Sequence, residues 1–149
     1  MFLDRETNRL WLTPSDVTTY LGSTWVFAQH LAVARGERKR WPQNDDGTIE
    51  ITRRRGDEHE RAYLEQLKAA GKKVAEIPRA RTTAEWDHSL LQTEQAINDP
   101  AIDVVFQAHF ELNGNWRGAA DFLERNEHGG FEPVDAKLAR SIKPYMVHQ

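Results

Sequence analysis

Two aspartates and a lysine near the C-terminal end of the chain have the residue types for phosphodiester cleavage. Residues 118–125 and 131–138 read as strands, and the insert between them ends in paired glycines, which allow the positive φ of hairpin turns. In a symmetric hairpin Asp121 lies opposite Asp135, and Lys137 projects from the same face. Opposed carboxylates repel each other unless a cation lies between them, and Mg²⁺ prefers carboxylate oxygens. The pattern therefore indicates a metal site.

The opposite face of this hairpin carries apolar residues. They are Ala120, Phe122, Val134, Ala136 and Leu138. We therefore expect one face to pack against a core while the other presents two carboxylates and an amine. An ordinary half-exposed hairpin with scattered charges is the alternative, because the same register also opposes Glu124 and Glu132.

A helix in the middle of the chain is expected to supply a further ligand. Its residues run from Arg53 to about Ala70. His59 precedes Ala62 and Tyr63 of the apolar stripe by three and four residues, which predicts an inward-facing imidazole in the first turn. A histidine at the core edge, bonded to a backbone carbonyl, is the alternative. Glu60, on a neighbouring face, is the reserve candidate.

Composition limits the classes of protein that remain. The chain has 149 residues, enough for one domain with a core, and its net charge of −3 means that any nucleic-acid contact must be local. There is no cysteine, which excludes disulfides, zinc–thiolate sites and a cysteine-ligated iron–sulfur cluster in this chain. Without a long apolar run or a signal-peptide pattern, the expected compartment is the cytoplasm.

The order of the remaining elements predicts an α/β (α+β) fold, with a central mixed sheet that contains a three-strand meander flanked by helices. An N-terminal segment, 13–35, is expected to form two short helices with a break at Gly22-Ser23. The other expected elements are a strand at 72–81, a helix that begins at Thr82 or Thr83 and ends near Pro100, a strand at 103–112 with a turn at 113–115, and a last helix at 141–149.

Four motifs occur in the order seen in RecB-like nucleases of the PD-(D/E)XK superfamily. They are the helix Arg55-Gly-Asp-Glu-His-Glu60, the strand Gly118-Ala-Ala-Asp121, the triplet Asp135-Ala-Lys137 and the terminal Gln149. The chain most resembles a branch of predicted RecB-like nucleases. The resemblance implies one nuclease domain over 1–149 with a restriction-endonuclease-like core at about 53–149. A tyrosine usually follows the motif glutamine, so the domain is expected to be incomplete at its C-terminus.

The resemblance also implies a role for each motif residue. His59 resembles the motif histidine that helps to hold the metal, and Asp121 and Asp135 resemble its two acidic ligands. The backbone carbonyl of Ala136 would complete the protein's share, and Lys137 resembles the catalytic lysine. Glu60, Arg140, Lys143 and Gln149 are possible substrate contacts. The implied cofactor is Mg²⁺ or Mn²⁺, and no iron–sulfur cluster is expected because the cysteine that some relatives have near Gly22 is missing.

The expected function is that of a metal-dependent nuclease, of the (exo)deoxyribonuclease type found in DNA repair, without strong sequence specificity. DNA is favoured as the substrate by the resemblance alone. A helicase partner and a downstream ribonuclease-H-like domain are expected only by analogy. Two other classes stay open: a catalytically silent nucleic-acid-binding module, and a metal-dependent phosphohydrolase that acts on a small molecule.

Overall fold

The computed structural model describes residues 1–5, 7–42 and 47–136, and these residues form two compact units. The N-terminal unit takes its described residues from Met1–Asn44 and Glu111–Gly118. The sheet unit takes its described residues from Asp45–Phe110 and Ala119–Leu138. Among the described residues, none of the helices combines the length and the apolarity that crossing a membrane requires.

The N-terminal unit contains a short hairpin and two helices. Strands β1 (Phe2–Asp4) and β2 (Arg9–Trp11) pair antiparallel, and helices α1 (Pro14–Gly22) and α2 (Thr24–Ala34) follow. The predicted break between the helices is confirmed. It lies at Ser23, whose hydroxyl accepts a hydrogen bond from the Val26 backbone N–H at 3.3 Å and so begins α2.

The central sheet has four strands in the order β3-β4-β5-β6. They are β3 (Val74–Glu76), β4 (Val104–Leu112), β5 (Trp116–Arg125) and β6 (Phe131–Val134). Strand β3 runs parallel to β4, whereas β5 and β6 pair antiparallel, so the sheet is mixed, as the sequence predicts. Strands β4, β5 and β6 are consecutive in the chain and adjacent in the sheet, which makes them the expected meander.

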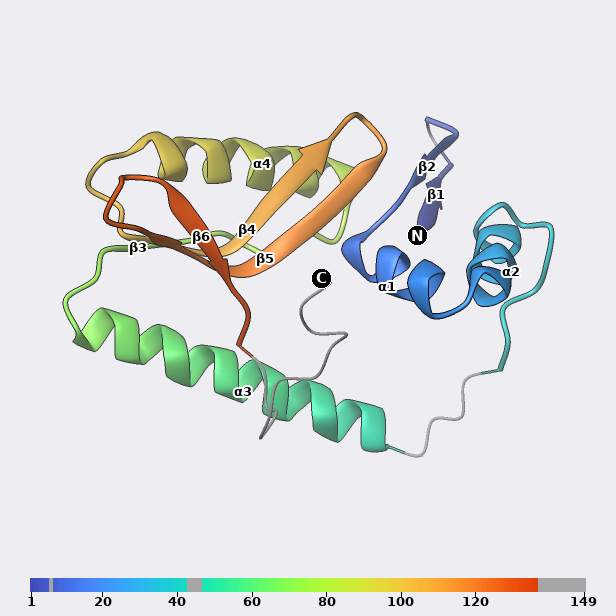
Figure 1. Cartoon of the computed structure of the whole chain (residues 1–149), viewed down its shortest axis with the longest axis horizontal. Coiled ribbons are helices and arrows are strands. Elements are labelled where there is room, and N and C mark those ends of the chain that lie inside the picture. Colours follow the sequence, from blue (N-terminus) through green and yellow to red (C-terminus); the bar gives the residue numbers. More distant parts are fainter. Residues whose placement is uncertain (6, 43–46, 137–149) are drawn as a thin grey trace. The chain divides into compact units, whose positions relative to one another are not determined.

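A helix covers each face of the sheet, α3 (Thr48–Ala69) on one and α4 (Thr83–Asn98) on the other (Figure 1). Neighbouring residues of a strand point to opposite faces, so each strand contributes to two cores. The α3-side cluster consists of Leu64, Leu67, Val104 and Phe122. The α4-side cluster consists of Ile77, Ala96, Val105, Ala108 and Leu123.

Two elements differ in length from their predictions. Helix α3 begins at Thr48, not at Arg53, and its first turns carry exposed residues such as Ile49 and Ile51. No buried stripe marks these turns, so hydrophobic periodicity could not locate the helix start. The predicted strand at 72–81 is reduced to β3, because Pro78 has no N–H with which to continue the ladder.

Candidate functional site

The two aspartates of the predicted metal site lie on β5 and directly after β6. These strands pair Phe122 with Val134 and Glu124 with Glu132, so the predicted register is confirmed. Continuing this register by one residue places Asp135 opposite Asp121. The Asp135 side chain is exposed and that of Asp121 is partly buried. The two aspartates are therefore the residues that adjoin the last pair of the β5–β6 ladder, Phe122 and Val134.

The faces of the hairpin differ from the prediction. Phe122, Val134 and Ala136 pack on the α3 side as expected, but Ala120 packs against the α4-side cluster. The other face is not a purely polar surface, since Leu123 is buried there. The reason is that α4 covers this second face, which the chain order alone did not reveal. Leu138 lies outside the described residues.

Glu124 and Glu132 oppose each other near the turn, and a tyrosine of α3 hydrogen-bonds one of them. The Tyr63 hydroxyl on α3 donates a hydrogen bond to Glu124 Oε1 at 2.5 Å. This bond to a carboxylate, together with burial, raises the pKa of Tyr63 to about 12. The Glu124 carboxylate therefore has a hydrogen-bond partner on α3.

The alternation of β4 breaks at Gln107. Phe106 packs against the α3-side cluster, as its position predicts, and Ala108 belongs to the α4-side cluster although it is only two residues further on. In a regular strand, residues at i and i+2 lie on the same face of the sheet. Val104 and Phe106 follow this rule and both pack on the α3 side, whereas Ala108 packs on the α4 side. The alternation therefore breaks at Gln107, between Phe106 and Ala108. Gln107 has a φ of 58°, the left-handed conformation that produces this kink.

Strand β5 has a matching break at Asp121. Ala120 packs on the α4 side whereas Phe122 belongs to the α3-side cluster. The Arg125 N–H donates to the Asp103 carbonyl at 2.8 Å, and counting four residues along each strand from this bond leads to Asp121 and Gln107. The breaks in the two strands therefore lie beside each other, next to the rings of Phe106 and Phe122, whose centroids are 4.9 Å apart and whose planes are tilted by 41°.

Gln107 connects this break to α3. Its side chain is 5% exposed, and its Nε2 donates to Glu60 Oε2 at 2.9 Å. The same carboxylate oxygen accepts a hydrogen bond from Arg79 Nη2 at 2.8 Å, and Arg79 Nη1 pairs with Asp57 at 3.0 Å. Burial alone would lower the pKa of Arg79, but these two carboxylates outweigh it and raise the pKa. Glu60 is thus held in one place by an amide and a guanidinium.

His109 and Thr93 hold the kinked backbone from the α4 side. His109 Nδ1 lies 2.8 Å from the Gln107 carbonyl oxygen, and the Ala80 N–H donates to Nε2 at 3.4 Å, so the ring fits a neutral tautomer. Burial lowers the pKa of His109, which keeps it neutral. The Thr93 hydroxyl oxygen accepts from the His109 N–H at 3.0 Å. These bonds over-determine the conformation of Gln107.

The predicted position of His59 is wrong. Its side chain is exposed on α3, in the middle of the helix and not in its first turn. The buried positions of this helix are Leu64 and Leu67, and with these Glu60, not His59, fits the i, i+4, i+7 spacing of one face. The role of His59 as a metal ligand stays a prediction.

Four predicted site residues lie outside the described part of the chain: Lys137, Arg140, Lys143 and Gln149. Within residues 1–5, 7–42 and 47–136, no group of three or more His, Asp or Glu side chains is arranged to hold a metal ion. Sequence reasoning missed Gln107 as part of the site. The available signal was one amide in the apolar run Val104-Val-Phe-Gln-Ala108.

Exchanging Gln107 should reverse the usual preference for alanine over glycine in a strand. Both Gln107→Gly and Gln107→Ala lose the bond to Glu60, but only glycine adopts a φ of 58° without strain. The glycine variant should therefore be the more stable of the two by about 1–2 kcal/mol. Urea denaturation measures this difference, and an alanine variant as stable as the glycine variant would contradict the assignment of strain.

Compared with protein-family models, with curated proteins and with solved structures, the chain matches none.

Proposed function

We propose that this protein is a metal-dependent nuclease that hydrolyses phosphodiester bonds, with DNA as the favoured substrate. The observation that carries the proposal is the β5–β6 register, whose last pair is Phe122 and Val134, so that its extension by one residue would oppose Asp121 and Asp135. Directly opposed like charges destabilise a hairpin. A divalent cation bound between the two carboxylates would turn this cost into a binding site.

A carboxylate of α3, Glu60, is linked to the strand beside β5, although it does not form a metal-binding group of three with the two aspartates among the described residues. Glu60 reaches β4 through its bond to Gln107, and Gln107 lies beside Asp121 at the paired breaks of β4 and β5. Of the two α3 candidates, Glu60 and not the exposed His59 is therefore the one linked to the break in β4. The carboxylates of Asp121 and Asp135 are hard oxygen donors, and this donor chemistry fits Mg²⁺ or Mn²⁺.

The roles of the protein groups follow from charge. Asp121 and Asp135 would hold the cation, with the backbone carbonyl of Ala136 as a further ligand. A bound Mg²⁺ lowers the pKa of water and withdraws charge from phosphoryl oxygens. The Lys137 ammonium would orient the attacking water or stabilise the charge that develops on the phosphate.

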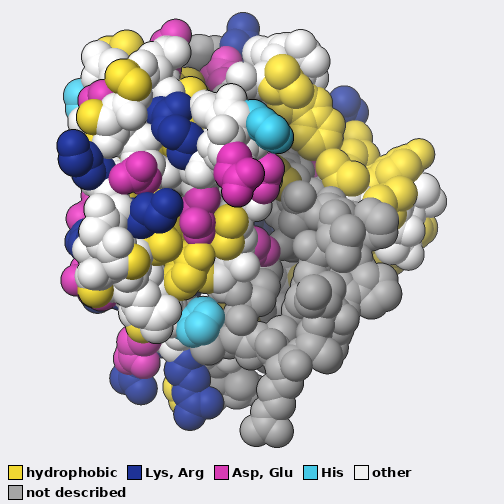
Figure 2. Space-filling view, turned by 60° about the vertical axis from the view of Figure 1, so that its left-hand side comes forward, with side chains coloured by type: hydrophobic (Ala, Val, Ile, Leu, Met, Phe, Trp, Pro, Cys, Tyr) yellow, Lys and Arg dark blue, Asp and Glu magenta, His cyan; other side chains and the backbone are white. Residues whose placement is uncertain are grey.

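The surface charge favours a nuclease that contacts the nucleic-acid backbone at few points. Among the side chains that Figure 2 colours by type, acidic and basic ones are interspersed and form no single large basic surface in this view. The net charge of −3 agrees with this distribution. Contacts to phosphates position a strand but read no sequence, so we propose cleavage without strong sequence specificity.

A catalytically silent binding module is the second candidate, and one contact favours it. Arg79 already pairs with Glu60 at 2.8 Å, so this carboxylate is neutralised without a metal. In a module of this kind the acidic cluster would have a structural role, and nucleic acid would bind without being cleaved.

A gel assay with labelled single- and double-stranded DNA, in Mg²⁺, Mn²⁺ or EDTA, tests the proposed function. The nuclease predicts cleavage with either metal and none in EDTA. Binding without cleavage under all conditions would favour the silent module. Hydrolysis of a small phosphate ester, with no cleavage of either DNA, would instead identify a small-molecule phosphohydrolase.

A further inference from the structure

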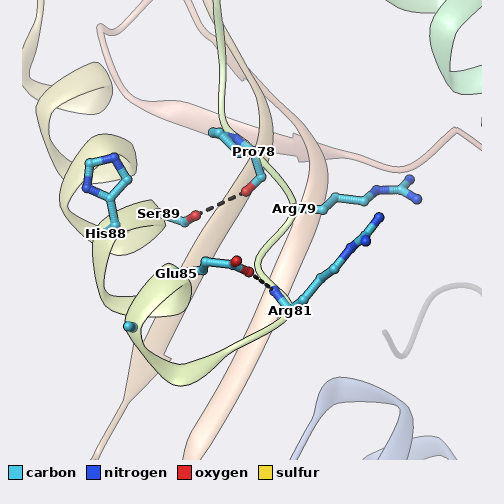
Figure 3. Close-up of a pocket in the computed structure, with 7 residues that line it drawn as sticks. Pro78, Arg79, Arg81, Glu85, His88 and Ser89 are labelled. Carbon is cyan, nitrogen blue, oxygen red and sulfur yellow. Dashed lines mark hydrogen bonds between the residues drawn. The ribbon is translucent and has the colours of Figure 1, made fainter.

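An open cavity lies between the β3–α4 connection and the first turns of α4, and neither Asp121 nor Asp135 lines it. Its volume is about 600 Å³, and Arg79, Arg81 and His88 are among its lining residues (Figure 3). Two of these three side chains are cationic, and the third is an imidazole. The cavity therefore has the chemistry to receive an anion.

The two arginines are placed to act together. They are separated by one residue in the connection between β3 and α4. In Figure 3 both side chains extend in the same direction, away from α4. Arg79 contacts Asp57 and Glu60, whereas the Arg81 guanidinium makes no ion pair or hydrogen bond with any residue that the structure describes.

The backbone that carries Arg81 is fixed by α4. Glu85 accepts hydrogen bonds from the backbone N–H of Arg81 at 2.6 Å and of Thr82 at 3.2 Å. The Ser89 hydroxyl donates to the Pro78 carbonyl at 3.0 Å, at the other end of the connection (Figure 3). The one acid of the cavity is therefore used to hold the loop, and Arg81 starts from a preorganised backbone.

We propose that this cavity binds a phosphate group of a nucleic-acid strand, with Arg81 as the principal contact. The choice of nucleic acid as ligand rests on the proposed function. Arg79 connects the cavity with the hydrogen-bonded network of Glu60, because it lines the cavity and also pairs with Glu60. A strand cleaved at the carboxylates would extend along Arg79, and a neighbouring backbone phosphate would reach Arg81. Guanidinium groups bind phosphates through paired N–H donors.

The test is fluorescence anisotropy with a labelled single-stranded oligothymidylate in EDTA, so that binding is measured without cleavage. Arg81→Gln should weaken binding by about 3–10-fold and reduce the salt dependence of the affinity by about one released counterion. Arg54→Gln is the matched control, since it removes the same charge from a side chain that is 71% exposed on α3. The control should bind as the parent does.

Equal affinities of the parent and Arg81→Gln would overturn the proposal, as would an equal loss in the Arg54→Gln control. Calorimetry with inorganic phosphate and thymidine monophosphate separates the two sources of a phosphate group. Arg81-dependent binding of these small anions without binding of the oligothymidylate would also overturn the proposal. Arg81-dependent binding of the oligothymidylate with no cleavage in the gel assay would support phosphate binding in the cavity and would contradict the proposed nuclease activity.

Discussion

Asp135→Asn should reduce Mg²⁺-dependent DNA cleavage by about 1,000-fold or more, because it removes a negative ligand from the proposed metal site. Each tenfold loss corresponds to about 1.4 kcal/mol of transition-state stabilisation, and charge stabilisation by a metal is worth several kcal/mol. Asp135 is exposed, so the fold should survive the exchange. Single-turnover cleavage of labelled DNA measures the rate, and circular dichroism checks the fold.

Glu132→Gln is the matched control for this experiment. It is also a carboxylate-to-amide exchange on an exposed side chain of the same hairpin, but Glu132 opposes Glu124, which already has Tyr63 as its partner. The control should cleave at the parental rate. If Asp135→Asn cleaves as fast as the parent does, the carboxylate pair is not the catalytic site.

Phe122→Ala should lower the free energy of unfolding by about 3–5 kcal/mol, the range for large aromatic side chains removed from a core. Phe122 is 0% exposed, and its ring lies 4.9 Å from the ring centroids of both Tyr63 and Phe106. The exchange leaves a cavity between α3 and the sheet, at the point where the two breaks in alternation begin. Urea denaturation followed by circular dichroism measures the effect.

Leu91→Ala provides the comparison on α4. Leu91 is 51% exposed, so its removal should change the free energy of unfolding by no more than about 0.5 kcal/mol. A loss of less than about 1 kcal/mol in Phe122→Ala would show that this ring does not hold α3 against the sheet.

Local signals were sufficient for the elements that place the two aspartates. The glycine-containing turn before Phe131 and the alternation after it predicted the register of β5 and β6, because hairpin pairing is set by the turn and by the strands beside it. Helix starts with capping residues were also predictable. Thr82 and Glu85 form a capping box at the beginning of α4, where each side chain bonds the backbone of the other.

The contacts of Glu60 could not be predicted in this way. They depend on Arg79 and Gln107, which are 19 and 47 residues away in the chain. The left-handed conformation of Gln107 has no local signal either, since glutamine rarely adopts it. His109 and the distant Thr93 hold it, since His109 Nδ1 lies 2.8 Å from the Gln107 carbonyl oxygen and the His109 N–H donates to the Thr93 hydroxyl on α4. The sequence pattern predicts His59, and not Glu60, on the inward face of α3. An apolar stripe shows where the apolar residues lie, but it does not show which polar residue lies among them.

Calorimetric titration of Mn²⁺ into the parent protein and into Asp135→Asn tests most directly whether the opposed aspartates form a metal site. We expect that the parent binds Mn²⁺, that Asp135→Asn loses this binding, and that Glu132→Gln retains it. Mn²⁺ binding of equal affinity in the parent and in Asp135→Asn, or no binding by the parent, would contradict the assignment of the site.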